Sequence, residues 1–196
     1  MSTRLPLVAA QPGIWMAERL STLPGAWSVA HYVELRGNLD PALLSKAIVA
    51  GLKQADTLSM RFCEDNGEAW QWVDDAREFA EPQNVDLRQQ ADPHMAALAL
   101  MQSDLGQNLR VDSGNPLVCH QLMRVGDDCW YWYQRYHHLL VDGFSFTAIA
   151  RRVAAIYTHI CRGDALEPTP FTAFSDVVAE YQAYREAPAW QRDADF

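Results

Sequence analysis

The sequence predicts a mixed α/β fold in which helices pack on a mostly antiparallel sheet, an α+β arrangement of two layers. Three features support this prediction: apolar residues recur at helical spacing in several segments, two long β-prone segments flank a short turn, and an Asn-Gly pair indicates a hairpin. The chain has 196 residues, of which 49% are hydrophobic and 21% are charged. This is enough for one domain with its own core, or for one lobe of a larger domain.

Two helices in the first half of the chain begin with the same signature. Asp40-Pro41 and Asp92-Pro93 each combine an N-cap residue with proline at the first helical position. The apolar residues that follow at helical spacing are Leu44, Ala47, Ile48 and Leu52 after the first cap, and Leu98, Met101, Leu105 and Leu109 after the second.

Four strands are predicted in two antiparallel pairs. The first pair joins residues 58–63 to residues 69–73 through Asn66-Gly67, and the second joins residues 117–125 to residues 129–138 through the turn at 126–128. Asn-Gly is typical of a type I′ turn. The last strand is rich in tryptophan and tyrosine, which favour strands.

The remaining elements are helices. After Asp142-Gly143 the apolar period becomes 3.6, and Gly163 closes this helix. A second amphipathic helix starts near Phe174, after a Pro-containing connector at 167–170, and a third is predicted over residues 188–196.

Charge and composition exclude several classes of protein. The formal net charge is −9, and the longest basic run, Arg151-Arg152, is predicted to be a solvated helix face, so a nucleic-acid partner is not expected. No apolar stretch is long enough to span a membrane, and the first residues do not form a secretory signal. The four cysteines contain no C-x-x-C pair, which favours buried free thiols in a cytoplasmic protein over a zinc site or disulfides.

Candidate chemistry lies between residues 136 and 145, where a strand ends and a helix begins. Adjacent strand residues point to opposite faces, so His137 and His138 should not bind one metal ion, and no metal site is expected. One imidazole should face the core and the other a cleft, but spacing alone does not distinguish them. Asp142 is first of all a helix N-cap, and it could also accept a hydrogen bond from His138 and set its tautomer. From the residues alone, a core histidine followed by a helix cap is the more common arrangement.

The segment from His137 to Gly143 resembles the H-H-x-x-x-D-G signature of condensation domains in nonribosomal peptide synthetases, within the chloramphenicol acetyltransferase-like superfamily. Three further segments resemble other boxes of this family in the same order: residues 9–15, residues 54–62 and residues 174–178. The resemblance covers the whole chain. It implies that residues 1–196 are the N-terminal lobe of a condensation domain whose second lobe is not in this sequence.

The resemblance also implies roles for individual residues. His138 matches the catalytic second histidine of the motif, which is a base toward the acceptor amine or a group that positions it. His137, Asp142 and Gly143 match structural positions: the aspartate usually pairs with an arginine, and the glycine allows a turn and leaves the channel open. Tyr136 and Ser145 are expected to lie along the substrate channel.

The implied reaction is amide-bond formation between two thioester-bound substrates. Within the family, the chain resembles siderophore-forming synthetases, which implies a 2,3-dihydroxybenzoyl donor on an aryl carrier protein and a seryl acceptor on the downstream peptidyl carrier domain. No cofactor is expected on this lobe, because substrates arrive on the 4′-phosphopantetheine arms of carrier domains. Adenylation and thioesterase domains are expected in the same synthetase.

Two alternatives stay open at this point. A coenzyme A-dependent acyltransferase shares the same histidine motif, and a condensation-like module could serve only as a non-catalytic interaction domain. If the second lobe is missing, an apolar face should be exposed and the isolated chain should self-associate.

Overall fold

The computed structural model describes residues 3–23, 25–107, 109–112 and 116–195, and this part of the chain forms two sheets with helices around them. The strands are β1 (Leu5–Pro6), β2 (Ser28–Arg36), β3 (Met60–Asp65), β4 (Glu68–Val73), β5 (Gln83–Asp86), β6 (Val118–Arg124) and β7 (Cys129–His137). The helices are α1 (Gln11–Leu20), α2 (Pro41–Leu52), the short 3-10 helix η1 (Asp56–Ser59), α3 (Pro93–Leu105), α4 (Gly143–Arg162), α5 (Phe174–Glu186) and α6 (Pro188–Ala194).

Most strand pairs are antiparallel, which confirms the predicted sheet type. The larger sheet has the order β2-β7-β6-β5, and only its β5–β6 pair is parallel. The smaller sheet has the order β1-β4-β3 and is antiparallel throughout. Strand β7 is therefore internal in the larger sheet, with β2 on one side and β6 on the other, and its C-terminal end leads directly to His138.

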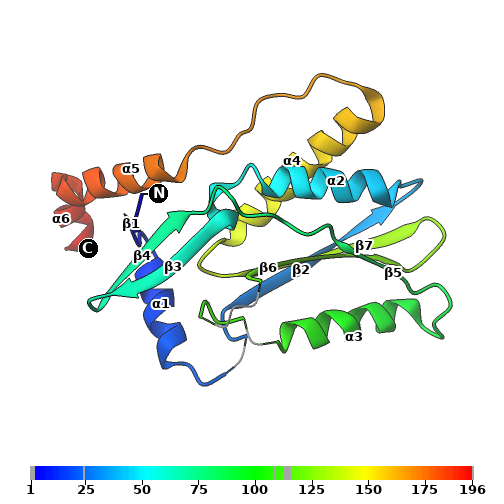
Figure 1. The fold of residues 1–196 in the computed structure, drawn as a ribbon, viewed down its shortest axis with the longest axis horizontal. Helices are drawn as coiled ribbons and strands as arrows, with labels where there is room; N and C mark the ends of the chain where they lie inside the picture. Colours follow the sequence, from blue (N-terminus) through cyan, green and yellow to red (C-terminus); the bar gives the residue numbers. More distant parts are fainter. Residues whose placement is uncertain (1–2, 24, 108, 113–115, 196) are drawn as a thin grey trace.

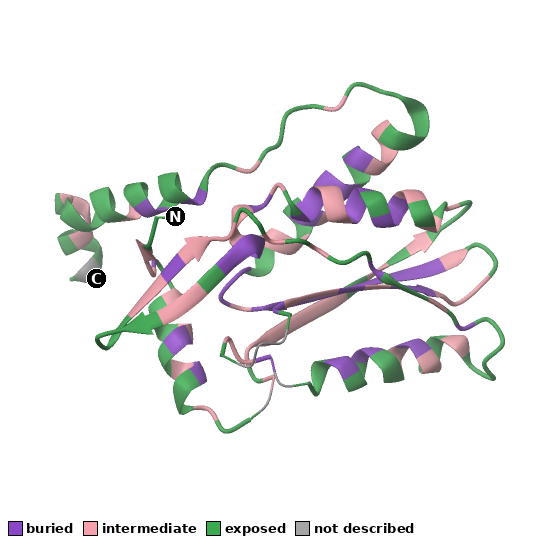
Figure 2. Ribbon diagram, viewed as in Figure 1, coloured by how far each residue is buried: buried purple, intermediate pink, exposed green. Residues whose placement is uncertain are grey.

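Helices cover both faces of the larger sheet (Figure 1). The main core cluster joins α2 and α4 to one face, and a second cluster joins Ala97 and Met101 of α3 to Tyr131 and Tyr133 on the other face. Consecutive β7 side chains are buried in opposite layers, and the strand is correspondingly buried along nearly its whole length (Figure 2). The sheet thus lies between two helical layers, one more layer than the sequence predicted, because α3 covers the second face.

The predicted helix ends and the hairpin turn are confirmed. The Asp40 and Asp92 side chains accept backbone hydrogen bonds at the starts of α2 and α3, and Gly163 ends α4 with a φ of 73°. Asn66 and Gly67 both have positive φ, at 53° and 83°, as a type I′ turn requires.

The apolar face predicted for α3 is wrong in its second half. The helix buries Ala97, Met101 and Asp104, whereas Leu105 is exposed and Leu109 lies beyond the helix end. Asp104 faces inward because β7 presents Arg135 to this layer, and the two side chains form a buried ion pair. A buried guanidinium needs an anionic partner, and this need decides which face of α3 packs on the sheet.

Two smaller predictions also require correction. Arg152 is buried rather than solvated: its guanidinium donates to Gln54 Oε1 at 2.7 Å and to the Glu167 carbonyl at 2.8 Å, tying α4 to the segment after α2 and to the connector before α5. The four cysteines are free, but none is fully buried, and Cys161 is exposed.

Five elements were not predicted: β1, α1, β2, η1 and β5. A signal for β2 exists in the sequence, because Val29, Val33 and Leu35 alternate with more polar residues and pack on the main core.

The predicted helix over residues 188–196 is present as α6, although Phe196 lies outside the described residues. In the described part of the chain, no helix is long and apolar enough to cross a membrane.

Candidate active site

The two adjacent histidines point away from each other, as strand alternation predicted. His137 is 1% exposed, and its Nε2 lies 2.9 Å from Glu18 Oε2 of α1. Its Nδ1 accepts a hydrogen bond of 3.1 Å from the Leu139 N–H. His138 is only partly buried and lines a cavity at the C-terminal end of β7. The structure therefore assigns the core position to His137 and the cleft position to His138.

The backbone sets the tautomer of His138. Its Nδ1 lies 2.9 Å from the Val141 carbonyl oxygen, and its own N–H donates to the Trp27 carbonyl at 2.8 Å. Because a carbonyl oxygen can only accept, the ring proton lies on Nδ1 and Nε2 keeps its lone pair. Such an imidazole can accept a hydrogen bond or a proton from an amine or a hydroxyl group. Asp142, which the sequence offered as the group that orients the imidazole, is replaced in this role by Val141.

Asp142 instead caps helix α4. Its Oδ1 accepts hydrogen bonds from the Phe144 N–H at 3.1 Å, the Ser145 N–H at 3.0 Å and the Ser145 hydroxyl at 2.7 Å. The Ser145 hydroxyl in turn accepts from the Asp142 N–H, which completes a capping box. These bonds, that of the Ser145 hydroxyl foremost, lower the pKa of Asp142. The arginine partner implied by the resemblance is not among the ion pairs of the described residues.

Gly143 is the first residue of α4 and does not have the positive φ that would require glycine. A Cβ at this position would meet no atom within 4 Å, so the space beside Gly143 is open and no close contact there requires a glycine.

The cavity beside His138 has a volume of about 240 Å³. Its walls come from the start of α1, the segment from His138 to Asp142, the start of α4 and the start of α5. Ser145, which the resemblance placed along a substrate channel, lies on this wall. A second cavity of about 330 Å³ shares Thr57, Asp142, Ser145, Phe174 and Val177 with the first. The two cavities are therefore adjacent at the N-terminus of α4, and together they are called the groove below.

Tyr136, the other predicted channel residue, does not line this groove. Its side chain is 0% exposed, its hydroxyl donates to Gln134 Oε1 at 2.9 Å, and its ring packs edge-on against His120 and Phe146. Burial raises the pKa of this hydroxyl, which therefore stays protonated. Tyr136 is a core residue, because its position in β7 directs it under α4 rather than toward the strand end.

Two residues of α1 contact the site and were given no role from the sequence. Gln11 Nε2 donates to the Leu139 carbonyl at 3.1 Å, and Glu18 reaches His137. Gln11 belongs to a segment that resembles a family box, which is a signal for it. Glu18 carries no such signal, because a glutamate in a helix is ordinarily solvated.

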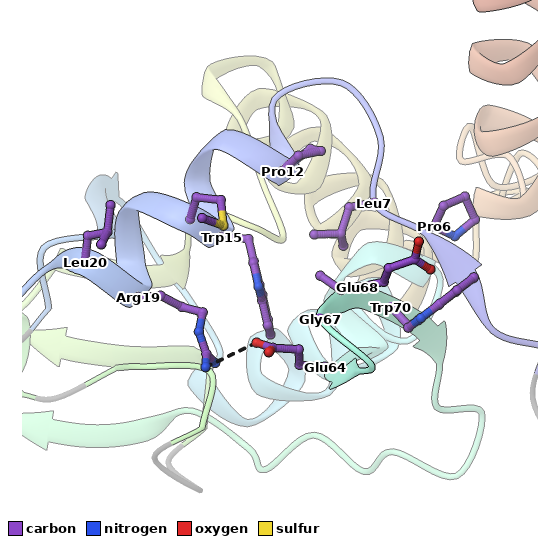
Figure 3. Close-up of a pocket in the computed structure, with 12 residues that line it drawn as sticks. Pro6, Leu7, Pro12, Trp15, Arg19, Leu20, Glu64, Gly67, Glu68 and Trp70 are labelled. Atoms are coloured by element: carbon purple, nitrogen blue, oxygen red, sulfur yellow. Dashed lines mark ion pairs between the residues drawn. The ribbon is translucent and has the colours of Figure 1, made fainter.

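A larger cavity, of about 720 Å³, lies between α1 and the β3–β4 hairpin and contains none of the predicted site residues (Figure 3). Trp15 and Arg19 line it from α1, and Arg19 pairs with Glu64 of β3 at 3.2 Å. Among the described residues, no group of three or more His, Cys, Asp or Glu side chains is arranged to hold a metal ion.

Comparisons with known proteins identify the family of this chain. The family model "Condensation domain" matches residues 1–196. Enterobactin synthase component F of Escherichia coli (strain K12) is 68% identical over 196 residues, which are 100% of this chain and 15% of that protein. Vanchrobactin synthetase VabF of Vibrio anguillarum is 36% identical over 211 aligned residues, covering 97% of this chain and 7% of that protein.

Solved structures show the same fold. The starter condensation domain of rhizomide synthetase RzmA matches with a TM-score of 0.87 and 32% identity, over 98% of this chain and 46% of that one. The first condensation domain of the calcium-dependent antibiotic synthetase matches with a TM-score of 0.88 and 27% identity, over 98% of this chain and 46% of that one. This chain thus spans less than half of these solved domains and a small part of the synthetases it resembles. The chain belongs to the condensation-domain family of nonribosomal peptide synthetases.

Proposed function

We propose that residues 1–196 form the N-terminal lobe of an amide-forming condensation domain, with His138 as its catalytic residue. The observation that carries this proposal is the hydrogen bond of His138: its Nδ1 donates to the Val141 carbonyl, which leaves Nε2 as the acceptor nitrogen of a side chain that lines the groove. A second lobe supplies the opposite wall of the channel. The isolated lobe is expected to be inactive, because the site is built between the two lobes.

The reaction joins two substrates that are tethered as thioesters. The acceptor amine attacks the carbonyl carbon of the donor thioester, the carbon–sulfur bond breaks, the amine loses one proton and the departing sulfur gains one. His138 Nε2 accepts a hydrogen bond from the amine, and either takes its proton or holds the amine in line for attack. Asp142 and Ser145 fix the start of α4, which keeps the Val141 carbonyl and therefore the imidazole in place.

The donor and acceptor are proposed from the similarity to one relative. At 68% identity to enterobactin synthase component F, the chain is expected to use a 2,3-dihydroxybenzoyl donor on an aryl carrier protein and a seryl acceptor on the downstream peptidyl carrier domain. Both substrates ride on 4′-phosphopantetheine arms, and the lobe itself binds no further cofactor. Adenylation and thioesterase domains belong to the same cytoplasmic synthetase.

A second candidate is transfer from soluble acyl-coenzyme A. A mutant of the RzmA starter domain, with a TM-score of 0.90 and 31% identity to this chain, was solved in complex with C8-CoA. That domain accommodates a coenzyme A thioester, and the same groove here could receive one. The carrier-bound donor is favoured because the chain is much more similar to the enterobactin protein.

The test is a donor competition in the synthetase that contains this chain. The seryl-loaded synthetase is mixed with dihydroxybenzoyl-loaded aryl carrier protein or with dihydroxybenzoyl-coenzyme A, and the amide product is followed by mass spectrometry. Amide from the carrier-bound donor alone supports the proposal. Equal or faster formation from the coenzyme A thioester would favour the second candidate, and no amide from either donor would overturn the proposed substrates.

A further inference from the structure

We infer that one face of helix α1 positions His138 for catalysis, through Gln11 and Glu18. This inference rests on the proposed role of His138 and extends it to two residues that act on the position of the imidazole; Gln11 also lines the cavity beside it. Gln11 and Glu18 are seven residues apart, so they lie on the same face of the helix two turns from each other. From that face, Gln11 contacts Leu139, which follows His138, and Glu18 contacts His137, which precedes it.

The two residues hold the backbone on either side of Leu139. Gln11 Nε2 donates directly to the Leu139 carbonyl at 3.1 Å. Glu18 acts through His137: its Oε2 lies 2.9 Å from His137 Nε2, and His137 Nδ1 accepts the Leu139 N–H at 3.1 Å. Because Nδ1 accepts from an N–H, the ring proton of neutral His137 lies on Nε2. This nitrogen is in close polar contact with Glu18 Oε2, although the two atoms do not form a hydrogen bond. The peptide group that directly follows His138 is thus tied to α1.

Both α1 residues are themselves held in place. Gln11 and Gln71 of β4 exchange two amide hydrogen bonds, of 2.9 Å and 2.8 Å, and Gln71 is fully buried. Gln11 Oε1 also accepts the Val8 N–H at 3.0 Å. Glu18 is buried, and its Oε1 accepts the Val111 N–H at 2.8 Å. Buried groups with several partners have little freedom to move, so they can transmit a fixed geometry to the segment between His138 and Val141.

The consequence for catalysis is geometric. The Nδ1–H bond of His138 is made to a carbonyl only three residues later, so a shift of the intervening backbone moves donor and acceptor apart. Misplacement of a catalytic group by about 1 Å can slow a reaction about 100-fold. Loss of either α1 contact should therefore lower the rate of the chemical step and leave carrier loading unchanged.

The test is a double-mutant cycle in the synthetase that contains this chain, with both carriers loaded and the rate of a single round of amide formation measured. Gln11→Ala and Glu18→Ala should each slow amide formation about 10-fold. Glu18→Gln should recover part of the rate, because its one amide oxygen can still accept from the Val111 N–H and the side chain keeps its volume beside His137. In a His138→Ala background, neither alanine substitution should slow the reaction further, since both residues act through His138.

Arg19→Ala is the matched control. It removes the Arg19–Glu64 contact between the same helix and the β3–β4 hairpin, on the side of α1 shown in Figure 3, and should leave the rate unchanged. If Gln11→Ala prevents folding, Gln11→Asn keeps the amide but withdraws it by one methylene group and should give the same loss.

Three results would decide against the inference. If Gln11→Ala or Glu18→Ala slowed amide formation by the same factor in the His138→Ala background as in the wild type, α1 would act independently of His138. Equal losses from Arg19→Ala would show a general structural effect of α1. An undiminished rate in His138→Ala alone would overturn the proposed role of His138 as well, and this outcome is distinct from the first two.

Discussion

At the scale of single residues, hydrogen-bond partners distinguish the residue of the His137–Gly143 motif that is available for chemistry from those with structural roles. His138 has one ring nitrogen bound to the Val141 carbonyl and one at the groove, whereas both ring nitrogens of His137 face protein groups. Asp142 Oδ1 accepts hydrogen bonds from three donors at the start of α4. Its contribution to catalysis is therefore indirect, through the position of the helix and of the backbone just before it.

Asp142 should accordingly be replaceable by another capping residue. Asp142→Ala should lower the free energy of unfolding by about 1 kcal/mol, because the Phe144 and Ser145 N–H groups lose their acceptor. Asp142→Asn keeps an acceptor oxygen and should cost less. Chemical denaturation of the three proteins at neutral pH measures both effects, and equal losses from the two variants would contradict a capping role.

The same aspartate should contribute to acid stability. Its pKa in the folded chain is lowered, first by the hydrogen bond from the Ser145 hydroxyl, from an unfolded value of about 3.9. A lowered pKa stabilises the folded state above the unfolded pKa, and this stabilisation is lost as the pH falls through the folded pKa. The stability difference between wild type and Asp142→Asn should therefore shrink in denaturation curves taken below about pH 4. A constant difference would contradict the assignment.

The sequence predicted part of this site for physical reasons. Strand alternation required His137 and His138 to diverge, and the Asp-Gly pair indicated a helix start. The choice between the two histidines depends on which sheet face is open at the strand end, which is a tertiary property. The partner of His138 is a backbone carbonyl, and no residue type in the sequence encodes that contact.

At the scale of elements, α2 and α4 pack so closely that a glycine is needed between them. A Cβ on Gly51 would lie 2.8 Å from Val153 Cγ2, and Val153 is buried. A Cβ on Gly13, in α1, would meet no atom within 4 Å. The two glycines are therefore matched helical positions that differ in the space around them.

Alanine substitutions at these two positions should change the free energy of unfolding in opposite directions. Gly51→Ala should lower the free energy of unfolding by about 1–3 kcal/mol through overpacking. Gly13→Ala should raise it by about 0.4–1 kcal/mol, because the unfolded chain loses freedom. Denaturant unfolding measures both, and Val153→Ala should relieve much of the cost of Gly51→Ala. Stabilisation by Gly51→Ala would show that the two helices are less tightly packed.

Elements with local signals were predicted, and elements defined by their surroundings were not. Asp-Pro caps, the Asn66-Gly67 turn and the aromatic strand β7 are encoded by neighbouring residues. The short strands β1 and β5 exist because neighbouring strands offer them hydrogen-bond partners. The exposed and buried faces of α3 were misassigned because Arg135, 31 positions away from Asp104, selects the buried face.

At the scale of the whole molecule, the groove is bordered by exposed apolar side chains. Phe144, at the start of α4, is 88% exposed and lines the groove together with Val177. The matched solved domains are about twice as long as this chain, which covers 46% of them. A surface of this kind, next to a site that we propose to be completed by a second lobe, is expected to associate with other copies when that lobe is absent.

The isolated chain should therefore self-associate through the groove. Light scattering coupled to size exclusion should give a mass above that of the 22.1 kDa monomer, and Phe144→Ser should shift it toward the monomer. Met95→Ser is the matched control, because Met95 is 56% exposed on α3, which covers the other face of the sheet. A monodisperse wild-type monomer would contradict this prediction.

The central claim of this account is that His138 carries the chemistry of amide formation. The most direct measurement follows the rate of a single round of amide formation in the synthetase that contains this chain, for wild type, His138→Ala and the control His159→Ala near the distal end of α4. Both carriers are loaded, and their loading is verified separately. The account predicts that His138→Ala slows the reaction about 100-fold or more, whereas His159→Ala does not. An undiminished rate in His138→Ala would contradict it and would make His138 a structural residue.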